Sequence, residues 1–184
     1  MFRFFSLLFA LLFVFSCQNS KPTPQHTVEV KKSEDEDNLL FSLAAELIPN
    51  PTTQAEKDKN TIINYVMDKG IEVQSTPSGL YYQLIEEGTG DLAKWGDWVT
   101  VNYKGYTLDG QVFDSSYKKG KPLEFYIGNM IAGWNEGLEL MRPGGKALFV
   151  IPSELAYGEK GFGKVIPPHT VLAFELELLG VTQK

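Results

Sequence analysis

The chain has 184 residues, 43% hydrophobic and 22% charged, a composition typical of one globular domain with short appendages. Its formal net charge of −6 argues against a nucleic-acid partner, because phosphate binding requires a basic surface. A lone cysteine, Cys17, excludes an intramolecular disulfide, and with His26 and His169 it supplies too few ligands for a structural zinc site.

The first residues have the pattern of an export signal. Residues 1–17 contain one charge, Arg3, followed by a mostly apolar run that ends at Ser16 and Cys17. The run is shorter than the ~20 residues of a membrane-spanning helix and fits a secretory signal peptide. A cysteine at this place resembles a bacterial lipobox. We predict a signal peptide at 1–16 and a lipidated Cys17; an ordinary signal peptide and an uncleaved anchor are the alternatives.

A polar stretch follows the cysteine. Residues 18–38 are rich in charged and polar side chains and include Pro22 and Pro24, so they have little apolar surface to bury. We predict that residues 17–38 form a disordered tether. The apolar residues 39–48 are then predicted to form a short helix, which Pro49 ends.

A second helix is predicted after this proline. Thr53 and Glu56 have the spacing of a capping box, and Lys69 and Gly70 suit the last turn and the residue that ends a helix. We therefore treat residues 39–75 as a helical lead-in that packs at the edge of the domain, or alternatively serves in dimerisation or client capture. One face of the second helix carries Ala55, Ile62 and Val66.

From residue 76 to residue 184 the pattern is that of strands. Asp109 and Gly110 form a hairpin-type turn, and a short helix is predicted at 133–140. The expected fold is α+β: an antiparallel β-sheet wrapped on one short α-helix. Strands are predicted at residues 80–85, 98–103, 123–127, 146–151 and 171–179.

Five motifs in this region resemble those of FK506-binding proteins, the FKBP-type peptidyl-prolyl cis/trans isomerases. They occur in the family's order and cover just over half of the chain. The lead-in and leader are similar to those of the family's bacterial lipoproteins. The motifs are V-T-V-N-Y-K-G at 99–105, G-Q-V-F-D-S-S at 110–116, I-A-G-W-N-E-G-L at 131–138, L-A-Y-G at 155–158 and V-I-P-P-H-T-V-L-A-F-E-L-E-L-L at 165–179.

The chemistry of such an enzyme requires no metal site, which agrees with the shortage of cysteine and histidine ligands in the composition. Rotation about an X–Pro bond has a barrier of ~18–20 kcal/mol, and a catalyst must bind the twisted amide better than either planar form. Twisting removes resonance and makes the amide less polar, so an apolar pocket favours the twisted state. No nucleophile, metal or cofactor is needed, and we expect none.

The resemblance implies a catalytic pocket of six side chains. Trp134 is expected to form its floor, under the proline ring, and Tyr157 to donate a hydrogen bond to the substrate carbonyl. The Asp114 carboxylate is expected to pair with the Tyr103 hydroxyl. The six are Tyr103, Phe113, Asp114, Trp134, Tyr157 and Phe174.

Five further positions are implied in substrate binding. Met130 and Ile131 are expected to face the substrate through their backbone, with the Ile131 side chain lining the pocket. Val165 and Ile166 belong to a loop over the pocket, and Leu123 stands where the family often has phenylalanine.

Two other departures concern the rim. Lys119 stands where an arginine often braces the aspartate, and lysine lacks arginine's bidentate fork. The 128–133 segment is shorter than in eukaryotic members. FK506-like macrolides are therefore candidate ligands of uncertain affinity.

We expect a peptidyl-prolyl isomerase that acts on proline-containing unfolded or folding polypeptides, anchored through lipid to the outer membrane and facing the periplasm. A non-catalytic chaperone, or a structural lipoprotein of an envelope machine, is the alternative. The retained aromatic residues and Asp114 favour catalysis.

Overall fold

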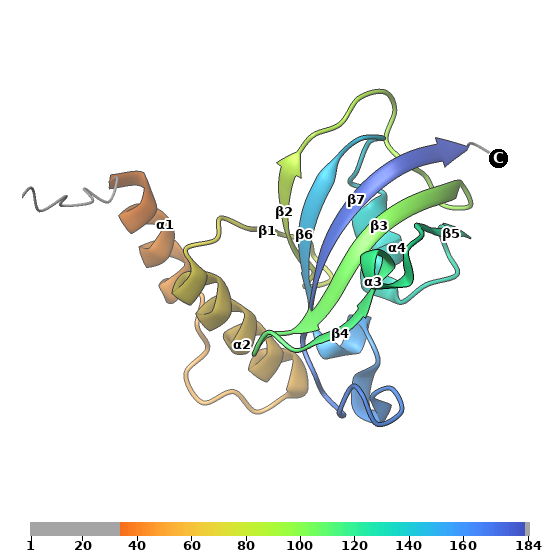
Figure 1. Ribbon diagram of the computed structural model, residues 1–184. Helices are drawn as coiled ribbons and strands as arrows, with labels where there is room; N and C mark the ends of the chain where they lie inside the picture. The colour runs from red at the N-terminus through yellow and green to blue at the C-terminus, as the bar shows by residue number, and fades with distance from the viewer. Residues whose placement is uncertain (1–33, 183–184) are drawn as a thin grey trace, which may run out of the picture. The chain divides into compact units, whose positions relative to one another are not determined.

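The computed structural model describes residues 34–182 (Figure 1). The predicted signal peptide, the lipidation at Cys17 and most of the tether lie outside the described residues. The helices are α1 (Glu34–Ala45), α2 (Gln54–Lys69), α3 (Ser116–Lys119) and α4 (Ala132–Leu138), with short 3-10 turns η1 (Ser153–Leu155) and η2 (Gly158–Lys160).

Helix α1 begins at Glu34, earlier than the predicted start at residue 39, so the end of the predicted tether is helical. Residues 34–38 contain neither proline nor glycine, and the backbone therefore does not oppose a helix there. The helix ends at Ala45 instead of residue 48. Ile48 is instead held by Asn60 of α2, whose side-chain amide accepts from its N–H and donates to its carbonyl, both at 2.9 Å.

Helix α2 has the predicted caps. The Glu56 N–H donates to the Thr53 hydroxyl at 3.2 Å, and the Thr53 N–H donates to the Glu56 carboxylate at 2.9 Å. Hydrogen bonds from the Thr53 and Thr52 backbone lower the pKa of Glu56 to about 2. At the other end Gly70 adopts the left-handed conformation, with φ of 62°. The capping-box pattern was therefore sufficient to predict this helix.

Seven strands form one antiparallel sheet, which confirms the predicted fold class. Their order is β1-β2-β6-β7-β3-β4, and β5 pairs with β3. Strand β3 is longer than predicted because residues 104–106 pair with both β4 and β7, and Thr107 pairs with β7. The strands are β1 (Gln74–Ser75), β2 (Tyr81–Glu86), β3 (Trp98–Thr107), β4 (Val112–Ser115), β5 (Leu123–Tyr126), β6 (Lys146–Ile151) and β7 (Leu172–Thr182).

Successive side chains of β6 and β7 point to opposite faces of the sheet, and both faces are buried. Phe149 and Phe174 belong to the core that contains Trp134 of α4, whereas Val150 and Ala173 belong to a second core with α2. In Figure 1 α4 lies behind β3 and β7, and α2 lies to the side of β6. The lead-in helix thus packs on a face of the sheet, and β1 begins before the predicted boundary at residue 76.

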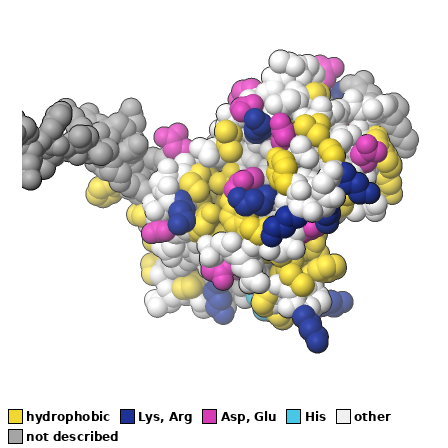
Figure 2. Space-filling view, viewed as in Figure 1, with side chains coloured by type: hydrophobic (Ala, Val, Ile, Leu, Met, Phe, Trp, Pro, Cys, Tyr) yellow, Lys and Arg dark blue, Asp and Glu magenta, His cyan; other side chains and the backbone are white. Residues whose placement is uncertain are grey.

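Charges of both signs are mixed on the surface. Figure 2 shows lysine and arginine side chains interspersed with aspartate and glutamate among hydrophobic side chains on the face viewed. This face offers no continuous basic area of the kind that binds nucleic acid.

Candidate active site

The floor of the candidate site is Trp134 on α4. Its side chain is 2% exposed, and its indole nitrogen has no hydrogen-bond partner within residues 34–182. Helix α4 lies close to β6 because it carries Gly137, where an added Cβ would be 2.6 Å from the tip of the Phe149 ring. The close contact buries the indole between helix and sheet.

Aromatic rings surround Trp134 edge-on. The Tyr103 ring centroid lies 5.1 Å from that of Trp134 at 80°, and Phe174 lies 5.2 Å away at 83°. Phe113 meets Phe174 at 5.6 Å and 85°. These are the T-shaped arrangements that aromatic pairs favour. They require Gly105, where a Cβ would lie 2.5 Å from Phe174. The structure thus brings four of the six predicted catalytic side chains into one dry cluster.

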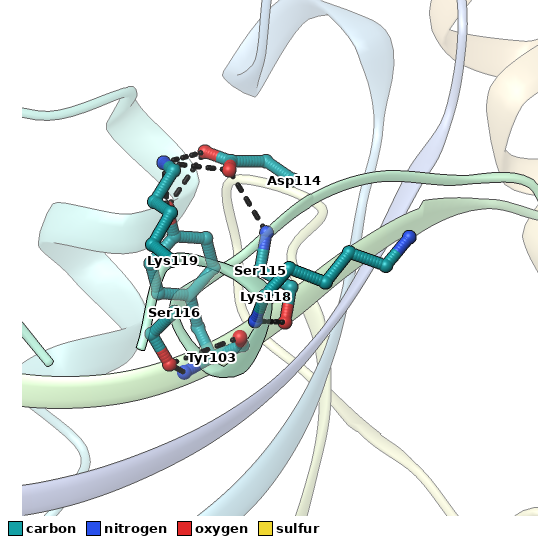
Figure 3. Close-up of polar contacts among 6 residues, drawn as sticks. All are labelled: Tyr103, Asp114, Ser115, Ser116, Lys118 and Lys119. Carbon is teal, nitrogen blue, oxygen red and sulfur yellow. Dashed lines mark hydrogen bonds and ion pairs between the residues drawn. The ribbon is translucent and has the colours of Figure 1, made fainter. Parts of the chain in front are cut away.

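A polar network lies beside this cluster (Figure 3). The Tyr103 hydroxyl donates to Asp114 Oδ2 at 2.6 Å, as expected. The Lys119 ammonium lies 2.6 Å from Oδ1 and 2.8 Å from Oδ2, and donates to the Tyr103 hydroxyl at 2.9 Å. The Ser115 N–H donates to Oδ1 at 2.8 Å. A single ammonium therefore reaches both carboxylate oxygens, although it lacks the guanidinium fork.

The network holds Asp114 in its ionised form. Partial burial alone would raise its pKa, but the hydrogen bonds from Lys119, Tyr103 and the Ser115 backbone together lower it below the ordinary value. Burial, followed by the bond to Asp114, raises the pKa of Tyr103. The bonds to Asp114 and then Tyr103 raise the pKa of Lys119. All three groups thus keep fixed charge states near neutral pH.

The short helix α3 supplies Lys119 to this network. Ser115 caps its start by accepting from the Lys118 N–H, and Gly120 ends it in the left-handed conformation. The buried Ser116 hydroxyl accepts from the Tyr103 N–H at 2.9 Å and donates to the Asn102 side chain at 3.1 Å. Ser116 therefore fixes α3 against β3. The sequence pattern did not predict this role; the second serine of the F-D-S-S motif is its signal.

Tyr157 lies between η1 and η2 and is half-buried. Its ring contacts Phe162 at 4.9 Å and 34°. Its hydroxyl bonds to no other residue that the structure describes. Burial, and then the charge of Asp114, raises the pKa of Tyr157. The hydroxyl is therefore protonated and free to donate.

In the loop beside Tyr157, the two residues predicted to lie over the pocket differ in how far they are exposed. Ile166 is buried in the core, whereas the Val165 side chain is 51% exposed. Ile166 pairs with Phe162 through backbone hydrogen bonds of 2.8 and 3.1 Å. Phe162, 58% exposed, was not among the predicted site residues. An aromatic residue between glycines in G-F-G was its available signal.

Asn135 organises the segment before α4. Its side chain accepts from the N–H groups of Gly128 and Met130, and donates to the Met130 carbonyl at 2.7 Å. The N–H and carbonyl of Met130 are thus bonded within the protein. That this backbone faces the substrate stays a prediction. The Ile131 N–H has no partner in the described part of the chain. Met130, Ile131 and Leu123 are half-buried against the aromatic core.

Comparisons with known proteins agree with this geometry. Residues 90–179 match the family of FKBP-type peptidyl-prolyl cis-trans isomerases. The probable FKBP-type isomerase of Haemophilus influenzae is 41% identical over 163 residues, which cover 85% of this chain and 68% of that protein. FkpA of Escherichia coli K12 is 43% identical over 146 residues, 79% of this chain and 53% of that protein.

Two solved structures are similar to the fold. The crystal structure of FkpA from Escherichia coli has a TM-score of 0.63 at 39% identity, covering 81% of this chain and 63% of that one. That of AtFKBP13 has a TM-score of 0.57 at 39% identity, over 61% of this chain and 100% of that one. This chain therefore spans little more than half the length of full FkpA.

An antiparallel sheet around one short helix gives this chain the FKBP class of fold, and the aromatic floor of its candidate site lies beside a bonded aspartate. The chain belongs to the family of FKBP-type peptidyl-prolyl cis-trans isomerases. The predicted family and enzyme class are confirmed.

Proposed function

We propose that this chain accelerates cis/trans isomerisation of X–Pro bonds in polypeptides, at the site between Trp134, Asp114 and Tyr157. The observation that carries the proposal is the juxtaposition of a dry aromatic cluster with a preorganised carboxylate. Tyr103 belongs to both: its ring contacts Trp134, and its hydroxyl donates to Asp114.

The site contains what the reaction requires. An amide twisted out of plane loses resonance and polarity, so rings that exclude water favour it over the planar ground state. The free Ile131 N–H and Tyr157 hydroxyl are donors for the carbonyls of a bound peptide. Each ~1.4 kcal/mol of preference for the twisted form gives about tenfold in rate, so a few such contacts are sufficient.

A protease-coupled isomerisation assay on a proline-containing peptide tests the proposal. We expect turnover by the wild type and a loss of about 2- to 10-fold in kcat/KM for Tyr157→Phe, the effect of one hydrogen bond. Tyr117→Phe is the matched control, because Tyr117 is 63% exposed on α3. A folded wild-type chain without turnover would contradict the proposal.

We further propose that the mature protein is a lipoprotein of the cell envelope, acylated at Cys17. The support is the sequence of residues 1–17 alone. Within the described residues, none of the helices is long and apolar enough to cross a membrane. Metabolic labelling with palmitate should mark the wild type and not Cys17→Ala; equal labelling of both would refute the assignment.

Capture of unfolded chains without catalysis is a second candidate. Phe162 and Val165 expose apolar surface next to Tyr157, as a peptide-binding rim does. Trp134→Leu separates the two functions. If the chain only captures unfolded polypeptides, the wild type should show no isomerase activity and Trp134→Leu should still suppress aggregation of an unfolded substrate, whereas Phe162→Ser should lose the suppression.

A further inference from the structure

Helix α2 buries a carboxylate in its apolar face. Asp58 is 2% exposed and lies one turn before Ile62 and two turns before Val66, both fully buried. Its Oδ2 accepts from the Ser153 N–H at 2.7 Å and the Ser153 hydroxyl at 2.6 Å. Its Oδ1 accepts from the Gln54 side chain at 2.6 Å. A buried carboxylate is tolerated only when it is bonded in this way.

Ser153 begins the segment that carries Tyr157. It is fully buried, is separated from β6 by Pro152 alone and opens the turn η1. The first N–H groups of a helical turn lack a partner within it, and Asp58 supplies the partner for Ser153. The turn continues through bonds from Leu155 N–H to Pro152 and from Ala156 N–H to Ser153, both at 3.0 Å. Tyr157 is the next residue.

We propose that Asp58 is a positioning residue for the isomerase site: by holding Ser153, it fixes the turn η1 and thereby the place of the Tyr157 hydroxyl. The inference rests on the proposed function and deepens it. It makes α2 part of the scaffold of the site, although α2 lies outside residues 90–179 that match the family.

The choice of a carboxylate supports a positioning role. An apolar side chain between α2 and the sheet would fill the same space without desolvating a charge. It would leave the Ser153 N–H and hydroxyl buried without an acceptor, and the start of η1 would be free to shift. The hydrogen bonds between Asp58 and Ser153 specify one arrangement of η1, whereas apolar packing alone would not specify one.

Kinetics on four variants test the proposal. Asp58→Ala and Ser153→Ala should each lower kcat/KM by about 2- to 5-fold, since the Tyr157 donor is displaced but retained. The double variant should be no worse than Asp58→Ala alone, because both changes break the same contact. Val66→Ala is the matched control: it removes a buried side chain from the same helix without touching Ser153. It should lower the melting temperature and leave kcat/KM unchanged.

A structural readout separates this inference from the proposed function. The amide resonances of Tyr157 and Gly158 should move in Asp58→Ala and Ser153→Ala, and stay in place in Val66→Ala. If Asp58→Ala does not fold, Ser153→Ala decides, since it removes one hydroxyl only. Unmoved amides, or equal kinetic effects in Val66→Ala, would overturn the positioning role. Shifted amide resonances in a chain that shows no isomerase turnover would support the positioning role of Asp58 and contradict the proposed isomerase function.

Discussion

Asp114 acts through its fixed charge. The isomerisation transfers no proton, and the bonds from Lys119 and Tyr103 keep the carboxylate ionised. We expect kcat/KM to be flat from about pH 6 to 8, because an ordinary aspartate titrates near ~3.9 and only histidine titrates in that window. The lowered pKa of Asp114 moves its titration still further from that window. A bell-shaped profile centred near neutrality would require acid–base catalysis instead.

The bond partners of Asp114 can be separated by substitution. Lys119→Met should allow the pKa of Asp114 to rise and lower kcat/KM by about 2- to 3-fold, a modest effect because the pair is partly exposed. Lys119→Arg should retain activity, since guanidinium can contact both carboxylate oxygens. Lys118→Met, the neighbouring exposed lysine, is the control. Equal activity in Lys119→Met would show that Tyr103 and Ser115 are sufficient.

At the level of elements, the capping box of α2 predicts an acid dependence of stability. The folded pKa of Glu56 is lowered from 4.5 to about 2. Its contribution is therefore fully present above pH 4.5 and is lost as pH falls toward 2. We expect Glu56→Gln to be less stable than the wild type to urea at pH 7, and the difference to disappear near pH 2. Glu72→Gln, an exposed change after the helix, should show no such trend.

The sequence was sufficient where local chemistry decides the structure. Thr53, Glu56 and Gly70 delimit α2 because caps act within one turn. Asp58 could not be predicted as buried, since its partner Ser153 is 95 residues away. Its spacing of four from Ile62 was a signal, but a charged residue on an apolar face is usually solvated.

The same distinction applies to the site. The aromatic residues and Asp114 could be inferred from motifs, and the structure brings them together. Asn135 and Ser116 were missed because they bond to backbone of another segment, which leaves no periodic trace.

For the whole molecule, the two cores predict different outcomes of truncation. A chain of residues 53–184 loses α1, which contributes Leu43 to the second core, and should remain folded and active with a small loss of melting temperature. A chain of residues 76–184 also loses Ile62, Ile63 and Val66 and exposes the opposite face of the sheet. It should be strongly destabilised and aggregate. Similar melting temperatures for both would contradict the packing of α2.

The buried indole of Trp134 also gives the protein an intrinsic fluorescent probe of its pocket. The chain has three tryptophans, of which Trp95 is 66% and Trp98 48% exposed, whereas Trp134 is 2% exposed. Replacing the two exposed residues by phenylalanine would leave one fluorophore, at the pocket floor. Its emission should lie at short wavelength and change when a peptide covers the ring. The affinity for proline peptides can then be measured from the change in Trp134 fluorescence, without a turnover measurement.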